Sequence, residues 1–257
     1  MAAEAPAIPG AADRALKLQN VVELRRYFLH PGRREDLIAL FDRHFVESQE
    51  ACGMAVLGQF RDLDRPDDFV WLRGFADMQS RKEGLSAFYG GPIWAEHREK
   101  ANATMERFDD VLLLKPADGG AGLPLESAAR PIPDARQKTA SLFTIFTFPL
   151  APWRADAFPA YFSEMLLPAL TAAGAPAGAR FVTEERQNTF PRLPVRENER
   201  VFVWIARFED EAAHRAFSSR LRAAEDWRSA MADGFHGHAN APLSICRLSP
   251  TARSLLR

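Results

Sequence analysis

The stretch FVWL at residues 69–72 returns as FVWI at residues 202–205, and this repetition decides the fold. The offset is 133 residues (202 minus 69), and at the same offset Trp94 meets Trp227. Four of the five tryptophans of the chain pair in this way. Because a sequence that repeats at a fixed offset indicates copies of one structural unit, the 257 residues are expected to form two small modules in tandem.

Upstream of these strands the offset between the copies is 121 residues, as when Gly53 meets Gly174. The difference of 12 residues (133 minus 121) predicts an insertion in the second copy, between Gly174 and Phe202. Its expected place is TFPRLP at residues 189–194, because closely spaced prolines interrupt strands.

Each copy shows the order strand, helix, strand, strand, helix, strand, with a short extra helix before the last strand. This is the β-α-β-β-α-β order of a ferredoxin-like unit, so the predicted fold class is α+β with two tandem ferredoxin-like modules. The predicted strands cover residues 21–29, 54–61, 69–75 and 111–115 in the first copy and residues 141–150, 180–187, 201–208 and 243–248 in the second.

Helix boundaries are marked at equivalent positions of the two copies. Gly53 and Gly174 are predicted to end the first helix of each copy. Asp77 and Asp210 are predicted to cap the second helices. Pro168 is expected to bend or shorten the first helix of the second copy.

The composition along the chain predicts the domain boundaries. Residues 1–19 are expected to be a disordered tail, residues 20–117 the first module and residues 140–250 the second. Residues 118–139 are rich in glycine and proline, which is typical of a linker. Residues 251–257 are expected to be a tail.

The formal net charge of −1 argues against a nucleic-acid partner, since proteins that bind phosphate backbones carry a basic excess. No apolar run approaches the roughly 20 residues that a membrane-spanning helix needs. Cys52 and Cys246 lie in no CxxC motif or Cys/His cluster, which predicts reduced thiols and a cytoplasmic location. The heavy use of alanine and arginine is typical of a bacterial source.

Three short motifs carry a resemblance to a known family. Residues 23–27 read ELRRY, residues 30–32 read HPG and residues 92–94 read PIW. The set resembles the NIPSNAP family, whose opening strand reads roughly E-L-R-x-Y before P-G and which carries D-P-x-W farther on. Gly91 stands here where that family usually has aspartate. The resemblance covers the first module well and the second module more weakly.

The resemblance implies that two four-stranded sheets pack face to face into a dimeric α/β barrel with the helices outside. Tandem modules form this barrel within one chain, as a monomer with an internal pseudo-dimer, or the chain pairs as a homodimer. The wider superfamily includes cofactor-free monooxygenases, isomerases and haem proteins, and NIPSNAP members share no settled activity. A shared fold does not carry function with it.

Alternation along the first and third predicted strands puts Glu23, Arg25 and Tyr27 on one face, and Trp71 and Arg73 on another. If these faces line the barrel, they form a ligand pocket. The guanidinium of Arg25 then clamps a carboxylate or enolate oxygen, and the phenol of Tyr27 donates to a developing oxyanion. The carboxylate of Glu23 takes a proton. The alternative is a buried ion pair flanked by aromatic rings at the interface between the modules.

The second copy lacks the charged residues of the first strand. Thr144, Phe146 and Phe148 stand where the first copy has glutamate, arginine and tyrosine. Trp204, the counterpart of Trp71, is a further pocket candidate because a flat apolar ligand stacks on such a ring.

His236 and His238 form the one close pair of histidines. In an extended segment they bind a metal or a haem; in the alternative they belong to a loop at the rim of a pocket. His97 is expected on a solvated helix face, and His44 is expected to stand alone. The sequence contains no GxGxxG, P-loop, HExxH or GxSxG motif.

These observations predict a protein that binds a small organic molecule in the barrel cleft, with cofactor-independent chemistry like that of a monooxygenase or an isomerase. The first alternative is a non-catalytic interaction or scaffold protein whose barrel interior is filled by Trp71, Phe146, Phe148 and Trp204. The second alternative is a haem-binding protein. Whether the chain is an enzyme stays open at this point.

Overall fold

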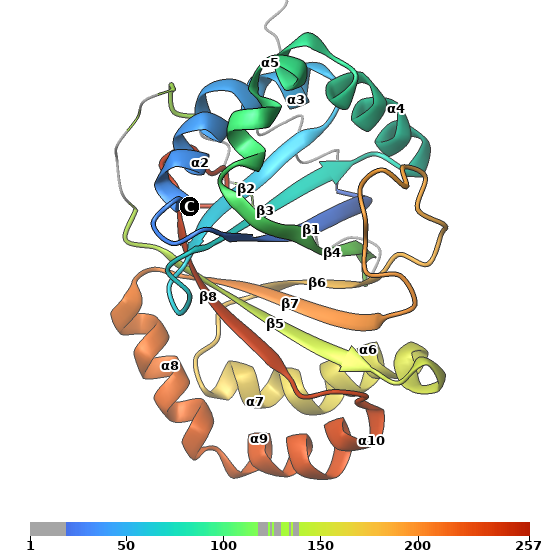
Figure 1. Cartoon of the computed structure of the whole chain (residues 1–257). Helices are drawn as coiled ribbons and strands as arrows, with labels where there is room; N and C mark the ends of the chain where they lie inside the picture. The colour runs from blue at the N-terminus through green and yellow to red at the C-terminus, as the bar shows by residue number, and fades with distance from the viewer. Residues whose placement is uncertain (1–18, 118–122, 124, 126–129, 134, 136–138) are drawn as a thin grey trace, which may run out of the picture.

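A computed structural model describes residues 19–117, 123, 125, 130–133, 135 and 139–257. Eight antiparallel strands form one closed barrel, and helices cover its outside (Figure 1). This architecture confirms the predicted barrel of two sheets with outer helices. The predicted tail at residues 1–19 lies outside the described residues except for Gln19.

The barrel consists of two four-stranded halves joined edge to edge. The strands are β1 (Val21–Leu29), β2 (Ala55–Asp62), β3 (Asp68–Phe75), β4 (Met105–Pro116), β5 (Leu142–Leu150), β6 (Gly178–Thr183), β7 (Arg200–Phe208) and β8 (Ser244–Pro250). The order around the barrel is β1-β3-β2-β8-β5-β7-β6-β4. Within each half, therefore, the first strand lies between the third and the fourth. The β2–β8 and β4–β6 pairs close the barrel, so no sheet edge is left unpaired.

Most strand bounds agree with the sequence pattern to within about two residues, and two differ. Strand β4 begins at Met105 rather than at Val111. Strand β6 ends at Thr183 rather than at Gln187. The backbone N–H of Glu184 makes one more bond to β4, to the carbonyl of Leu113 at 2.8 Å, and the chain then leaves the sheet.

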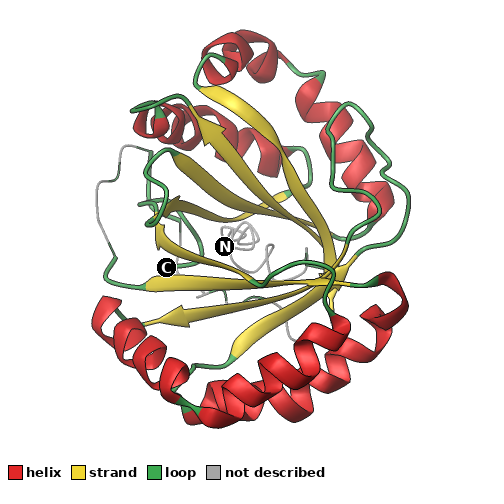
Figure 2. Ribbon diagram, turned by 60° about the horizontal axis from the view of Figure 1, so that its bottom comes forward, coloured by secondary structure: helices red, strands yellow, loops and turns green. Residues whose placement is uncertain are grey.

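The helices lie on the outer faces of the two halves (Figure 2). Those of the first half are α2 (Arg34–Leu40), η1 (Phe41–Phe45), α3 (Val46–Ala51), α4 (Met78–Tyr89) and α5 (Pro92–Asn102). Those of the second half are η2 (Pro152–Ala157), α6 (Phe158–Tyr161), η3 (Phe162–Leu166), α7 (Leu167–Ala172), α8 (Glu211–Ala223), α9 (Glu225–Ser229), η4 (Ala230–Phe235) and α10 (His236–His238).

The helix boundaries follow local chemistry. Asp77 and Asp210 each accept a hydrogen bond of 2.7 Å from a backbone N–H in the next turn, which confirms both predicted caps. Gly53 and Gly174 adopt φ angles of 86° and 91°, a region that favours glycine and that ends a helix. Of the two effects expected of Pro168, shortening is not seen, since the helix continues through it to Ala172.

The two halves share an irregular feature. A π-helical turn interrupts the first helix of each half, at η1 and at η3. The two turns are 121 residues apart, the same offset as between Gly53 and Gly174.

The barrel interior is a hydrophobic core of mainly aliphatic side chains, joined by Phe60, Phe143 and Phe181. Leu24 of β1, Leu72 of β3, Ile145 of β5 and Ile205 of β7 all face it. These residues lie next in sequence to the residues predicted to face inwards.

The prediction that Glu23, Arg25, Tyr27, Trp71 and Arg73 line the barrel is therefore wrong. Each of these side chains lies on the opposite face, between the sheet and the helices of the first half. The same inversion places Trp204, Phe146 and Phe148 under the helices of the second half rather than in the interior. Because β1, β3, β5 and β7 are buried on both faces, alternation alone does not tell which face lies inside the barrel. A choice that is off by one residue moves every side chain of the strand to the other core.

The chain outside the two predicted modules also contributes to the core. Leu255 and Leu256, in the predicted C-terminal tail, are buried in the barrel interior. Leu123, in the predicted linker, joins the same core. Arg130, also from the linker, donates to the carboxylate of Glu50 at 2.6 Å. No helix among the described residues is long and apolar enough to cross a membrane.

Candidate functional site

A buried cluster of charge lies between the sheet and the helices of the first half. The carboxylate of Glu23 accepts hydrogen bonds from Arg25 at 2.9 Å and from Arg73 at 2.6 Å through one oxygen. Its second oxygen accepts from Arg81 at 2.7 Å. All four side chains are 0% exposed. The first strand, the third strand and α4 thus hold three guanidinium groups around one carboxylate.

This cluster contains more positive than negative charge. Burial alone would raise the pKa of Glu23, but the guanidinium groups of Arg73, Arg25 and Arg81 hold it well below its usual range. One carboxylate therefore faces three cations. The other close partners are neutral amides, since Arg73 donates to Gln49 at 2.7 Å and Arg81 donates to Asn188 at 2.9 Å.

Two guanidinium nitrogens of the cluster have no hydrogen-bond partner. They are Nη2 of Arg25 and Nη2 of Arg81, and both are buried. Buried polar atoms normally find a partner, so such orphans call for an explanation. They indicate that the arginines of the cluster have more N–H donors than the carboxylate of Glu23 accepts.

Tyr27 connects this cluster to a cavity. Its hydroxyl accepts a hydrogen bond of 3.1 Å from Nε of Arg25, and its ring packs edge-on against Trp71 at 5.9 Å between centroids. Burial raises the pKa of the Tyr27 phenol, so the group keeps its proton at neutral pH. A phenol that accepts from a guanidinium still has its own O–H to donate.

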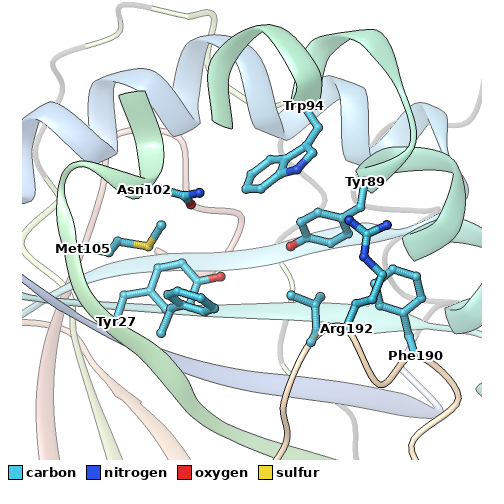
Figure 3. Close-up of a pocket in the computed structure, with 9 residues that line it drawn as sticks. Tyr27, Tyr89, Trp94, Asn102, Met105, Phe190 and Arg192 are labelled. Carbon is cyan, nitrogen blue, oxygen red and sulfur yellow. The ribbon is translucent and has the colours of Figure 1, made fainter. Parts of the chain in front are cut away.

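The cavity has a volume of about 150 Å³ and lies beside β1 under α4 and α5. It is lined mainly by aromatic and apolar side chains: Tyr27, Tyr89, Trp94, Asn102, Met105, Phe108, Phe190, Arg192 and Leu193. The hydroxyls of Tyr27 and Tyr89 point into the same space from opposite sides (Figure 3). The lining residues include one cation, Arg192, and neither a carboxylate nor a histidine.

One wall of this cavity comes from the second half of the chain. The loop between β6 and β7, residues 184–199, rises past the first half (Figure 1). Asn188 fixes it there by accepting from Arg81, and the hydroxyl of Thr189 donates to the carbonyl of Met78 at 3.1 Å. The ring of Phe190 stacks on Tyr89 at 5.9 Å. The stretch that the sequence marks as an insertion therefore closes the cavity.

The second half has no comparable charge at the equivalent positions. Thr144, Phe146 and Phe148 replace Glu23, Arg25 and Tyr27, and Ala206 replaces Arg73. The ring of Phe146 lies 5.2 Å from Trp204, and Phe148 packs against Phe162 at 5.8 Å. Aromatic rings thus fill the space that the charge cluster occupies in the first half.

A second cavity, of about 280 Å³, opens into one mouth of the barrel. Arg26 and Cys246 line it, from the face of the strands that the sequence did not favour. The guanidinium of Arg26 lies 3.9 Å from both Asp62 and Asp68, and the Cys246 thiol donates to Asp62 at 3.2 Å. At this mouth the guanidinium of Arg26 is therefore flanked by two carboxyl groups.

The histidines lie elsewhere than expected. His236 and His238 belong to the short helix α10, not to a loop, and α10 covers the second half, away from the cavity (Figure 1). His238 stacks on Tyr161 at 5.1 Å. His97 is buried rather than solvated, and it stacks on His44 at 3.8 Å.

A metal site shared by His236 and His238 does not fit these positions. A helical backbone turns side chains at i and i+2 to different sides, so His236 and His238 do not converge on one ligand. Within the described part of the chain, no group of three or more histidine, cysteine or carboxylate side chains is placed to hold a metal ion.

Sequence reasoning found Glu23, Arg25, Tyr27, Trp71 and Arg73 as a group, and the structure brings them together. It missed the cavity residues contributed by α4, α5, β4 and the β6–β7 loop, namely Tyr89, Asn102, Met105, Phe108, Phe190, Arg192 and Leu193. No functional motif marks these residues. Phe190, Arg192 and Leu193 lie in the stretch predicted as an insertion, and they reach the first-half residues only because the β6–β7 loop crosses to that half.

Residues 22–118 match the NIPSNAP family model. The match confirms the resemblance that the ELRRY motif of the first strand suggests. It covers the half of the chain that carries the charge cluster and most of the cavity, while the loop residues that close the cavity lie outside it.

Three solved structures with the same fold align with nearly the whole chain. A candidate monooxygenase from Lactobacillus acidophilus NCFM matches with a TM-score of 0.52 and 11% identity, over 90% of this chain and 93% of that one. A candidate monooxygenase from Fusobacterium nucleatum subsp. nucleatum matches with a TM-score of 0.55 and 8% identity, over 90% and 92%. An anthrone oxidase-like protein matches with a TM-score of 0.54 and 10% identity, over 92% and 93%. At these identities the likeness establishes the fold. No curated protein matches the sequence.

Proposed function

We propose that this protein binds a small, flat organic molecule in the cavity between the first-half sheet and its helices. The observation that carries the proposal is the Tyr27 hydroxyl, which is held by Arg25 and still has a proton to donate into an aromatic-lined cavity. A cavity of about 150 Å³ is large enough for about one aromatic ring. Trp94 and Phe190 supply faces on which such a ring packs.

The chemistry that we propose is oxygenation without a bound cofactor. The donors of Tyr27 and Tyr89 stabilise negative charge on a ligand oxygen, as an oxyanion hole does. Because neither a carboxylate nor a histidine lines the cavity, the lining offers no strong base. That favours an electron-rich, easily ionised substrate that reacts with dioxygen over an isomerisation that needs a base. The names of the structural relatives, two monooxygenase candidates and an anthrone oxidase-like protein, point in the same direction.

Oxygen uptake tests this proposal. With resorcinol as the probe, one molecule of dioxygen reacts with one phenol to give one hydroxyquinone and one water. The rate should exceed the enzyme-free autoxidation rate, and Tyr27→Phe should lower it by about 10-fold or more. A rate equal to that of autoxidation with every electron-rich phenol tested would favour the non-catalytic alternative.

We also propose that the two halves arose by duplication and that the chain is a monomer. The shared strand order, the shared π-helical turns and the equivalent pairing of Trp71 with Arg25 and of Trp204 with Phe146 support duplication. The barrel closes within one chain, which supports the monomer. Light scattering during size exclusion should give the mass of one chain, and twice that mass would contradict the proposal.

A further inference from the structure

The cavity lining and the cluster behind it together carry a net positive charge. Arg192 is the one charged residue among the residues that line it, and its side chain is exposed at the rim. Arg192 makes a cation–π contact with Phe190 at 6.0 Å rather than an ion pair with a carboxylate. Behind the cavity, the cluster around Glu23 adds two uncompensated positive charges.

Buried charge of one sign is costly unless an opposite charge lies near it, because the interior screens charge poorly. All three arginines of the cluster are fully buried, and two of their nitrogens lack an acceptor. The described residues around the cluster provide one carboxylate, Glu23, and otherwise neutral amides and phenols. An anion placed in the cavity would offset this excess.

The hydrogen-bond donors of the cavity also favour an anionic ligand. Tyr27 accepts from Arg25, which fixes the phenol oxygen and leaves its O–H to donate into the cavity. The Tyr89 hydroxyl faces it across the same space (Figure 3). Two donors backed by a guanidinium suit an oxygen that carries a full negative charge.

Resting on the proposed function, we infer that the ligand of this cavity is an aromatic anion with a single negative charge, a carboxylate or a phenolate. Its charged oxygen lies between the hydroxyls of Tyr27 and Tyr89, and its ring packs on Trp94 and Phe190. Arg192 at the rim attracts the anion during entry. The barrel-mouth cavity carries no such preference, since Arg26 there is flanked by Asp62 and Asp68.

Benzoate and benzamide test this inference, because they share size and shape and differ in charge. Calorimetric titration of the full chain at pH 7.5 should show that benzoate binds at least about 10-fold more tightly than benzamide. Equal binding, or tighter binding of benzamide, overturns the inference and leaves the proposed function standing. If neither benzoate nor benzamide binds, and the larger probes 1-naphthoate and 1-naphthamide do not bind either, the result counts against the proposed function itself.

Substitutions test which residues give the preference for benzoate over benzamide. Tyr27→Phe should reduce the benzoate-to-benzamide ratio by about 10-fold, and Tyr89→Phe by a smaller factor. Arg192→Gln should reduce it by roughly 3-fold and make benzoate binding less sensitive to salt. Arg26→Gln, in the barrel mouth, is the matched control and should leave the ratio unchanged. Loss of the preference in Arg26→Gln together with its retention in Tyr27→Phe and Tyr89→Phe overturns the assignment to this cavity.

Discussion

Nε of Arg25 donates a hydrogen bond to the hydroxyl of Tyr27 at 3.1 Å, two residues along the same face of β1. Another nitrogen of the same guanidinium donates to Glu23. Three alternate residues of one strand therefore form a chain of contacts from a buried carboxylate to the wall of a cavity. This chain of contacts places the positive charge of the cluster beside Tyr27, one of the two phenols that line the cavity.

Removal of the Tyr27 hydroxyl should destabilise the protein, because Nε of Arg25 then joins Nη2 as a buried donor without an acceptor. We expect Tyr27→Phe to lower the free energy of unfolding by about 1–3 kcal/mol in urea titrations. Tyr89→Phe is the matched control, since the Tyr89 ring has the same cavity environment; its cost should stay below about 0.5 kcal/mol. Equal costs for the two variants would show that the Arg25–Tyr27 bond contributes little.

Neutralisation of Glu23 should lower the free energy of unfolding more than Tyr27→Phe does. Glu23→Gln leaves Arg25, Arg73 and Arg81 buried without an anion, and we expect a loss of about 3–5 kcal/mol in the free energy of unfolding. Glu35→Gln breaks the exposed ion pair with Arg61 and should cost at most about 1 kcal/mol. A mild effect of Glu23→Gln would mean that another anion already balances the cluster.

Asp42 should give the protein a measurable pH dependence. Burial raises the pKa of its carboxyl from 3.8 to about 6, while Gln59 donates to it at 2.7 Å. Between these two values the unfolded chain has lost the proton that the folded chain still holds, so stability falls as the pH rises through this window. Asp42→Asn cannot ionise and keeps an acceptor for Gln59. Relative to the parent protein it should gain up to about 3 kcal/mol between pH 4 and pH 7. Parallel stability profiles of the two proteins would contradict this assignment.

The β6–β7 loop should be needed for ligand binding although it belongs to the other half. Asn188 accepts from Arg81 and from the backbone of Phe190, and it donates to the carbonyl of Leu193. Asn188→Ala removes all three bonds, so trypsin should cleave after Arg192 faster and benzoate affinity should fall by about 10-fold. Gln187→Ala, at an exposed neighbour, should behave like the parent protein.

The internal repeat predicted the architecture well for a physical reason. Trp71 and Trp204 occupy the same register position against Arg25 and Phe146, and such positions must keep similar shapes in both halves. Gly53 and Gly174 are likewise required by backbone angles that favour glycine. These constraints are local, so a single sequence reveals them.

The orientation of the strands could not be predicted in the same way. Leu24 and Arg25 are both buried, one in the barrel and one under the helices, so no polar face marks the outside of β1. The cavity could not be predicted from the sequence for a different reason. Tyr27 and Arg192 come together only because the β6–β7 loop crosses to the first half. Contacts between segments this far apart depend on the complete fold.

A crystal structure with 4-bromobenzoate tests the location of the ligand site most directly, because bromine gives an anomalous signal that marks one position. We expect a peak in the cavity beside Trp94 and Phe190, with the carboxylate at the hydroxyls of Tyr27 and Tyr89. A peak in the barrel mouth beside Arg26 and Cys246, with the first cavity empty, would contradict it.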